Sequence, residues 1–574
     1  MIDYNYIDNN EELKEVMKSI ENVNCIGLRT ETTGLDPRHN KLRIIEIAVE
    51  GKAVIIIDFF KIDVEGKKAL KAFLESDVIK VAYNVKNDYK FLFVEGIDIS
   101  KNLYDTMLSA QVIDSGYYGI KFELRDLVAH YTNITMDTEY QKNDWAMDKL
   151  PQEQLVYSAY DAYVLLPLRK AMNEKLKKYN LTFTAAIEFA AIPAVAQMEL
   201  NGMYVDIKKL ESLHSRYRGE QNSLYEELNM YFPSDDINFN SPAQIKTALG
   251  AIDIYVKSTS KEELLPIAKR YEVVRLILQY KRIGKLLQFT EKIISTVDRE
   301  QRIYSNYSQC STKTGRFSCT DFNLQQIPHE PDMRECFTAP EGKVLVMADY
   351  SQIELRIASE IADDYRIIKA YKNNQDLHIL TASLVNNIPL DKVTKAERQS
   401  AKALNFGLLY GMGSSKFKNY AMNSYGVEMS LEEAEKFRNK YFAYYEGIKK
   451  WHKINSIKLK GITANQYFET RTLVNRRRLW LGEPSFTEVI NTPVQGTGAD
   501  ILKIALGMLP KNLRGTSAKI LATVHDEVLI EADVEEADKI KEILQNTMEM
   551  AGNNLLKKVP IVAEAVIADN WGDK

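Results

Sequence analysis

Two acidic positions that border apolar segments constrain this chain more than any other feature. The predicted strand 343–348, which is apolar after Lys343, ends directly in Asp349. Two further apolar runs flank His525, Asp526 and Glu527, a pattern that predicts a hairpin with acidic residues at its tip. A carboxylate that closes a buried strand is costly unless it is paired or bound to a metal ion. If the two segments meet in space, they form a two-metal site for phosphoryl transfer, although each segment alone also fits a structural role.

A stretch with helical spacing, residues 398–411, lies between these segments. Arg398, Lys402, Phe406 and Tyr410 recur every four residues, so they drift by only about 120° and share one face of a helix. Like charges at Arg398 and Lys402 slightly destabilise a free helix, and a bound polyphosphate would remove that penalty. Phe406 and Tyr410 would then offer flat surfaces to a base and a sugar. An amphipathic helix with two core aromatic residues is the alternative interpretation.

Residues 1–175 alternate between strand and helix patterns, which predicts an α/β unit. Glu31 follows an apolar strand start, Asp88 follows another strand, and Tyr157 and Asp161 lie one helical turn apart. Carboxylates gathered from three distant segments repel one another unless cations lie between them. Such a cluster suits Mg²⁺-dependent hydrolysis of a phosphodiester, whereas each segment alone also fits a helix cap or a surface charge.

The periodicity predicts individual elements in both halves of the chain. The predicted strands are 44–47, 54–57, 78–83, 343–348, 520–524 and 528–530. The predicted helices are 65–74, 124–131 and 151–172, followed by long helical stretches over 206–232 and 260–297 and by several helices that end near residue 460.

Composition limits the class of protein. A length of 574 residues predicts two to four domains, and 75 basic against 79 acidic residues give a net charge of −4. Residues 265–320 nevertheless contain 11 Lys or Arg and 4 Asp or Glu, a basic stretch that suits phosphate backbones or a solvated helix face. Four cysteines without a Cys-x-x-Cys pair favour a reducing compartment. The start of the chain resembles neither a signal nor a transit peptide, and no apolar run approaches the length of a membrane span.

The three N-terminal segments resemble the Exo I, Exo II and Exo III motifs of 3′–5′ proofreading exonucleases, over essentially the whole unit. The resemblance implies an RNase H-like α/β domain in which Glu31, Asp88 and Asp161 bind two metal ions. Tyr157 would orient the attacking water. The family's first motif reads Asp-x-Glu, and this chain has Arg29 at the Asp position. A cation in place of a bridging metal ligand predicts an exonuclease domain that folds but is inactive or severely weakened.

The downstream segments resemble family A DNA polymerases, the class of bacterial DNA polymerase I and related phage replicases. Motifs A, B and C correspond to residues 349–356, 398–411 and 525–527, and further matches lie at 198–206, 312–318, 323–328 and 491–497. The resemblance implies a right-hand α+β polymerase domain over residues 176–574, after an exonuclease-like domain over 1–175. The thumb would span about 206–300 and the fingers about 360–460, with the palm formed by the flanking segments.

The same resemblance implies a role for each matching residue. Asp349 and Asp526 would bind two Mg²⁺ ions, with Mn²⁺ as an alternative, and Glu527 would support the site near the primer terminus. Lys402 would also donate a proton to the departing pyrophosphate. The residues implied to contact the incoming nucleotide are Arg398, Lys402, Phe406, Tyr410, His378, Gln352 and Glu354, the last as a steric gate against ribose. The residues implied to read the DNA minor groove are Arg316, Asn491 and Gln495.

The sequence therefore predicts a monomeric DNA-templated DNA polymerase that extends a primer 3′-hydroxyl on primer–template DNA with dNTPs. A stand-alone nuclease is an alternative that Arg29 disfavours, and a non-catalytic DNA scaffold is disfavoured by the intact downstream carboxylates. A single-subunit RNA polymerase shares part of the architecture, but Glu354 and the exonuclease-like domain favour deoxynucleotides. Because the chain starts directly at that domain, we expect a phage replicase or a short bacterial form, acting in the cytoplasm of a bacterial or phage-infected cell.

Overall fold

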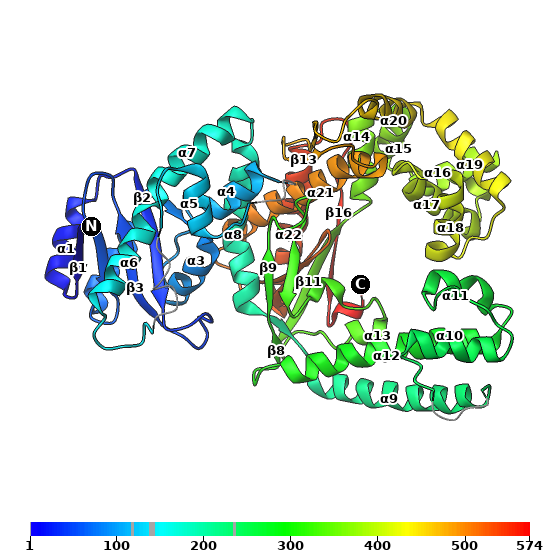
Figure 1. Ribbon diagram of the computed structural model, residues 1–574, viewed down its shortest axis with the longest axis horizontal. Coiled ribbons are helices and arrows are strands. Elements are labelled where there is room, and N and C mark those ends of the chain that lie inside the picture. Colours follow the sequence, from blue (N-terminus) through cyan, green and yellow to red (C-terminus); the bar gives the residue numbers. More distant parts are fainter. Residues whose placement is uncertain (1, 116–119, 137–143, 233–236, 574) are drawn as a thin grey trace.

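The protein is seen in a computed structural model that describes residues 2–115, 120–136, 144–232 and 237–573. An N-terminal α/β unit occupies one end of its long axis, and a larger unit occupies the other (Figure 1). The larger unit has a central antiparallel sheet from which two helical arms extend, one formed by α9–α12 and the other by α14–α20.

A mixed six-stranded sheet in the order β1-β4-β3-β2-β5-β6 forms the base of the N-terminal unit. Its strands are β1 (Tyr4–Ile7), β2 (Cys25–Thr32), β3 (Leu42–Ala48), β4 (Val54–Asp58), β5 (Ile79–Ala82) and β6 (Leu103–Asp105). Its helices are α1 (Asn10–Ser19), α2 (Val64–Leu74), α3 (Val85–Val94), α4 (Thr106–Ile113), α5 (Leu124–Tyr131), α6 (Gln152–Tyr163) and α7 (Leu165–Lys178). Strand β2 pairs antiparallel with β3 and parallel with β5, which makes it the centre of the sheet.

The strands and helices predicted for this unit are confirmed, with one correction. The helix predicted over 151–172 is two helices, because α6 ends at Tyr163 and α7 begins at Leu165. Pro167 lies in the first turn of α7. Proline has no N–H to continue the hydrogen bonds of the preceding helix, so the chain restarts a helix there instead of extending the first one.

Helix α8 (Thr182–Asn201) connects the two units (Figure 1). By length and mean hydropathy it could cross a membrane, which the sequence analysis did not anticipate, and it is the only such helix in the described part of the chain. It is apolar all round because it is buried on two sides. Ile192 and Ala196 pack into the core of the N-terminal unit, and Ala194 and Val195 pack beneath the central sheet of the larger unit.

The central sheet has the order β14-β15-β11-β16 and is antiparallel throughout. Its strands are β11 (Lys343–Tyr350), β14 (Lys519–Val524), β15 (Glu527–Asp533) and β16 (Ala563–Ala568). Along β11, Val346 and Ala348 face one core, and Leu345 and Met347 face another. Since both faces are covered, the strand is a continuous apolar run. The sequence analysis missed β16, whose edge position leaves its side chains only partly buried.

The remaining elements form the arms and connectors. The first arm contains α9 (Ile207–Asn229), α10 (Pro242–Ala251), α11 (Lys261–Ala268) and α12 (Glu272–Thr296). The second contains α14 (Ile353–Ala362), α15 (Tyr365–Lys372), α16 (Leu377–Asn386), α17 (Lys395–Leu409), α18 (Ser414–Tyr425), α19 (Leu431–Tyr444) and α20 (Glu446–Leu459). The others are β7 (Met203–Tyr204), β8 (Arg302–Ile303), β9 (Ser305–Ser308), β10 (Ser318–Asp321), α13 (Pro331–Arg334), β12 (Tyr467–Arg471), β13 (Arg477–Leu481), α21 (Phe486–Asn512) and α22 (Ala537–Asn553).

Candidate active site

The two acidic segments meet at one end of the central sheet. Val524 pairs with Glu527 across a two-residue turn, and Asp349 lies directly opposite Glu527 in the register of β11 and β15. His525 in that turn has a left-handed φ of 59°, a conformation uncommon outside glycine. This turn positions Asp526 beside Asp349, and both aspartates line one pocket of about 620 Å³. The prediction that these segments come together is confirmed.

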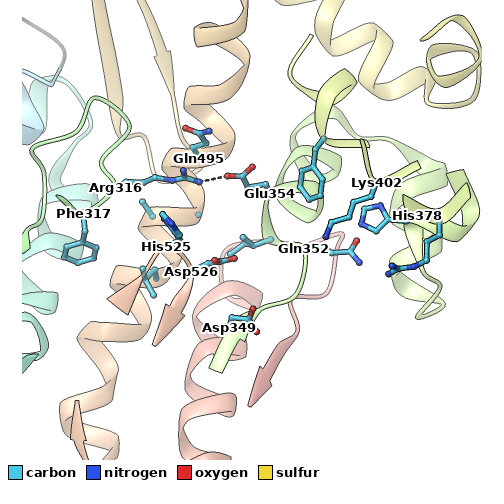
Figure 2. Close-up of a pocket in the computed structure, with 16 residues that line it drawn as sticks. Arg316, Phe317, Asp349, Gln352, Glu354, His378, Lys402, Gln495, His525 and Asp526 are labelled. Carbon is cyan, nitrogen blue, oxygen red and sulfur yellow. Dashed lines mark hydrogen bonds and ion pairs between the residues drawn. The ribbon is translucent and has the colours of Figure 1, made fainter. Parts of the chain in front are cut away.

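Figure 2 shows the pocket between the central sheet and the second arm. Arg316 and Gln495 lie on one side of it, and Lys402 and His378 lie on the other. The predicted site residues that line it are Arg316, Asp349, Gln352, Glu354, His378, Arg398, Lys402, Phe406, Gln495 and Asp526. The three predicted residues outside its lining are Tyr410, Asn491 and Glu527.

Glu527 lines an adjoining pocket of about 410 Å³ that also includes Asp349 and Asp526. The indole Nε1 of Trp571 donates a hydrogen bond of 3.4 Å to Glu527. The Arg334 guanidinium lies 4.5 Å from the Trp571 ring centroid. The sequence analysis missed Arg334 and Trp571, because they come from distant segments and belong to no local pattern.

Glu354 is held in the pocket by two hydrogen bonds. Arg316 and the hydroxyl of Tyr410 each donate a hydrogen bond to one of its two carboxylate oxygens. Tyr410 was predicted to share a helix face with Lys402, but α17 ends at Leu409 and Tyr410 is its buried cap residue. Gly411 follows with a φ of 71°, which ends the helix at this point. Tyr410 therefore orients Glu354 from outside the pocket lining.

Two cations face the pocket from α17. A capping box at Thr394 and Glu397 starts the helix and fixes its position. Arg398 Nη2 lies 2.8 Å from Asp376 Oδ2. Burial acts to raise the pKa of Asp376, but hydrogen bonds to backbone amides and to Arg398 outweigh it and lower the pKa. Lys402 forms no ion pair within the described part of the chain, so its charge faces the pocket without a carboxylate partner.

His378 is held as a neutral imidazole. Its Nδ1 lies 2.9 Å from Nδ2 of Asn405, a donor, so the ring proton is assigned to Nε2. Burial lowers the pKa of His378 to about 4, and the nearby charges of Arg398 and Lys402 add to the effect. At neutral pH His378 can therefore donate a hydrogen bond to an oxygen without adding charge to the pocket.

The remaining predicted residues are also held in defined positions. Gln352 precedes α14 with a left-handed φ of 54°, and its side-chain oxygen accepts a hydrogen bond of 2.9 Å from Tyr371. Asn491 and Gln495 lie one turn apart on α21. The side-chain oxygen of Asn491 is buried and has no hydrogen-bond partner among the described residues, so it is available to a ligand.

The donor set suits a metal ion that also binds substrate. No three His, Cys, Asp or Glu residues gather into a metal site in the part of the chain that the structure describes. Asp349 and Asp526 supply two carboxylates to one pocket. Mg²⁺ is commonly bound by one or two carboxylates together with phosphate oxygens of a substrate, so these residues fit Mg²⁺ in that mode.

The predicted N-terminal site forms around Arg29. Strand β2 carries Arg29 and Glu31, α3 carries Asp88, and α6 carries Tyr157 and Asp161. The Nε atom of Arg29 lies 3.9 Å from Asp161 Oδ2. Burial alone would lower the pKa of Arg29, but the carboxylates of Asp88, Glu31 and Asp161 outweigh it and raise the pKa. A permanent cation therefore lies among the residues predicted to bind metal.

A fourth carboxylate in this cluster was missed from the sequence. Glu46 on β3 is the direct cross-strand partner of Arg29 and is fully buried. Within the part of the chain that the structure describes, neither of its carboxylate oxygens has a hydrogen-bond partner. Burial, followed by the charge of Glu31, raises the pKa of Glu46 well above its usual range, and burial raises the pKa of Glu31 to about 7. The cluster thus contains four acidic groups and one internal cation.

Comparisons with known proteins agree with this architecture. Residues 207–573 match DNA polymerase family A, and residues 4–177 match the 3′-5′ exonuclease family. DNA polymerase I of Aquifex aeolicus is 33% identical, over 99% of this chain and 100% of that protein. DNA polymerase I of Caldicellulosiruptor bescii is 32% identical over 88% of this chain and 59% of that protein, and that of Pseudomonas aeruginosa is 30% identical over 100% and 66%.

The polymerase domain of Pol1 from M. smegmatis, solved in complex with DNA primer-template and dNTP, has a similar fold. The TM-score is 0.84 at 23% identity, over 99% of both chains. The fold and the pocket define a template-dependent polymerase with an exonuclease-type domain at its N-terminus. The chain belongs to DNA polymerase family A and is a DNA-directed DNA polymerase.

Proposed function

We propose that this polymerase extends a primer 3′-hydroxyl with dNTPs by two-metal nucleotidyl transfer, and that its N-terminal domain does not hydrolyse DNA. One observation carries the first part of the proposal. Asp349 and Asp526 line the same pocket as Arg398 and Lys402, so carboxylates that suit metal ions face cations that suit a triphosphate.

The reaction joins the primer oxygen to the α-phosphorus and breaks the bond to pyrophosphate. Asp349 and Asp526 would supply the carboxylate oxygens that hold Mg²⁺, or Mn²⁺ in its place. When bound, these ions would lower the pKa of the 3′-hydroxyl and stabilise the charge of the leaving group. Arg398 and Lys402 neutralise the triphosphate, and Lys402 donates the proton that the pyrophosphate takes up. Glu527 supports the primer side of the site from the adjoining pocket.

Selection of the nucleotide falls to other residues of the pocket. Phe406 stacks on the incoming base and sugar, while His378 donates to phosphate and Gln352 contacts the nucleotide. Glu354 occupies the space that a ribose 2′-hydroxyl would need, and Tyr410 acts through Glu354. Arg316, Asn491 and Gln495 read minor-groove acceptors, which mismatched pairs displace. Arg316 is paired with Glu354 here, so contact with DNA requires that pair to open.

The absence of exonuclease activity follows from the position of Arg29. The family's bridging Asp is replaced by a cation whose Nε lies 3.9 Å from Asp161. Glu31, Asp88 and Asp161 then balance Arg29 instead of binding two metal ions, and Tyr157 has no metal-activated water to orient. Electrostatic repulsion excludes a divalent ion from the space next to a guanidinium.

The partners follow from the same proposal. We assign residues 1–175 to the exonuclease-like domain and 176–574 to the polymerase, with the thumb over about 206–300 and the fingers over about 360–460. Its substrates are primer–template DNA and dNTPs, consistent with the ligands named for the M. smegmatis structure. The protein would act as a monomer in the cytoplasm of a bacterial or phage-infected cell.

The test uses a 5′-labelled primer on a longer template, with Mg²⁺, in the presence and absence of dNTPs. We expect extension with dNTPs and no shortening without them. Shortening without dNTPs would show that Arg29 is tolerated and that the exonuclease proposal is wrong. A primer that binds but changes in neither reaction would indicate a non-catalytic DNA scaffold.

A further inference from the structure

A second large pocket lies at the other end of α14 from the active site. It has a volume of about 890 Å³ and is lined by residues of α15, α20 and the end of α19. Figure 1 shows where these helices lie in the second arm. Helix α14 begins at Ile353 in the active-site pocket and ends at Ala362 in this one. Ten residues of helix separate the two by about 15 Å. We call this second site the fingers pocket.

The walls of the fingers pocket are fixed in position. The Asp364 carboxylate accepts hydrogen bonds of 2.9 Å and 3.2 Å from the backbone N–H groups of Gly447 and Ile448 on α20. It also caps α15 through the N–H of Ile367. A Cβ on Gly447 would lie 2.5 Å from the Asp364 Cα, so the close approach of the two segments requires glycine there. The pocket is therefore preformed.

Four cations from two distant segments converge on this pocket. Arg366 comes from α15, and Lys449, Lys450 and Lys453 come from α20. All four side chains are exposed, and none forms an ion pair within the described part of the chain. Lys449 and Lys453 are like charges at a spacing of four residues, which destabilises a helix unless an anion lies between them.

The acidic residues of the fingers pocket do not cancel this charge. Asp363 forms an ion pair of 2.8 Å with Lys558. Asp364 is buried and accepts backbone hydrogen bonds. Among the described lining residues, Glu446 is the one other carboxylate, against four cations. The pocket is therefore positive and suits a polyanion.

Two tyrosines distinguish the kind of polyanion. Tyr365 lines the pocket with 72% of its surface exposed, and Nζ of Lys369 lies 5.9 Å from its ring centroid. The Arg366 guanidinium lies over the ring of Tyr444, with Cζ of Arg366 5.4 Å from the ring centroid. Aromatic rings beside cations are the features by which proteins bind single strands, with bases stacked and phosphates neutralised. An acidic peptide would use the cations but would leave Tyr365 without a role.

We propose that the fingers pocket binds single-stranded nucleic acid, with phosphates on Arg366, Lys449, Lys450 and Lys453 and a base stacked on Tyr365. The inference rests on the proposed function in one respect, because the strand supplied to this pocket is the unpaired template ahead of the active site. The contacts are to phosphates and base faces, so binding is independent of sequence.

The test measures binding of the full chain to primer–templates with a template overhang of about 2 or about 16 nucleotides. We expect the wild-type protein to bind the long overhang about tenfold more tightly. We expect the triple variant K449Q/K450Q/K453Q to lose this preference. The slope of log affinity against log salt concentration, measured on the long overhang, should fall in magnitude by about 2, because each lost phosphate contact contributes about 0.7. Y365A weakens binding of the long overhang at least about fivefold.

A matched control replaces three exposed lysines far from the pocket, K14Q/K18Q/K539Q, and keeps the wild-type preference. An unchanged preference in the pocket variant, or an equal loss in the control, would overturn the proposal. Binding of polyglutamate is measured for the wild type and the pocket variant. If the pocket variant lost polyglutamate binding but kept the preference for the long overhang, the pocket would bind acidic peptides and the proposal would be wrong. Extension of the short-overhang substrate by the wild type is measured in parallel. If the wild type does not extend this primer, the proposed function fails, whatever the result for the pocket.

Discussion

Asp349 and Glu527 lie directly opposite each other in the antiparallel register of β11 and β15. Like charges at opposed positions destabilise a sheet. This end of the sheet therefore suits the binding of a cation, at a cost in stability. Asp526 is next to Glu527 in the turn and lines the same pocket as Asp349. The register of two strands thus creates the acidic centre of the polymerase.

The first prediction concerns D526N. Loss of this carboxylate should lower the rate of primer extension at least about 100-fold, because a direct metal ligand contributes at least as much as the groups that orient it. Primer–template binding and melting temperature should stay close to those of the wild type, since a negative charge is removed from an acidic cluster. Rapid-quench extension and fluorescence anisotropy measure the two effects. Equal extension rates for variant and wild type would rule out this site.

The second prediction concerns the proton donor. K402A should lower the rate of single-turnover dNTP incorporation by at least about 100-fold, the usual contribution of a general acid. K402R keeps the charge but donates a proton poorly. Compared with K402A, it should therefore restore dNTP affinity more than it restores the rate of incorporation. If both variants changed only the apparent Kd of the dNTP, Lys402 would bind phosphate without transferring a proton.

The third prediction concerns discrimination against ribose. Tyr410 holds one oxygen of Glu354, and Arg316 holds the other until contact with DNA opens that pair, so Tyr410 keeps this carboxylate in place. E354A should reduce the preference for dNTP over rNTP at least about tenfold by opening space for a 2′-hydroxyl. Y410F should give a smaller reduction, because it loosens Glu354 without removing it. An unchanged preference in E354A would assign the steric gate to another residue.

The fourth prediction concerns the exonuclease-like domain. R29D replaces the internal cation with the acidic residue that the family has at this position, and we expect it to shorten a labelled primer when Mg²⁺ is present and dNTPs are absent. Addition of D88N to R29D should remove that activity, which excludes a contaminating nuclease. If R29D stayed inactive while R29D/E46Q shortened the primer, Glu46 would be the remaining obstacle.

The fifth prediction is a pH dependence in the same cluster. Burial raises the pKa of Glu31 from 4.5 to about 7, so the folded domain takes up a proton between these values. The stability from this protonated group is complete below about pH 4.5 and is lost as the pH rises through about 7. The melting temperature of the wild type should therefore fall more between about pH 5 and about pH 8 than that of E31Q, by about 5 °C. E15Q, at an exposed glutamate, is the matched control. Parallel curves for wild type and E31Q would refute the assignment.

Most of the residues predicted for the polymerase site line one pocket, and the sequence could point to them because they belong to short motifs. Asp349 ends an apolar strand, and Arg398, Lys402 and Phe406 keep their spacing on one face of α17. Tyr410 was misplaced because helical spacing does not reveal where a helix ends. Gly411, with its positive φ, was the local signal for that end.

Other features depend on contacts between distant segments and have no local signature. Glu46 lies in a strand that is fully buried and mostly apolar, and only the β2–β3 register places it opposite Arg29. Trp571 reaches Glu527 from the end of the chain. The fingers pocket combines Arg366 of α15 with three lysines of α20, and each helix alone has the pattern of a solvated face.

The most direct test of the central claim is templated insertion of a single nucleotide. Four primer–templates that differ only in the first unpaired template base are each incubated with one dNTP at a time and Mg²⁺. We predict rapid addition of the complementary nucleotide alone in all four cases, and none by D349N. Addition of the same nucleotide on every template, or of none on any, would contradict the assignment of this chain as a template-directed DNA polymerase.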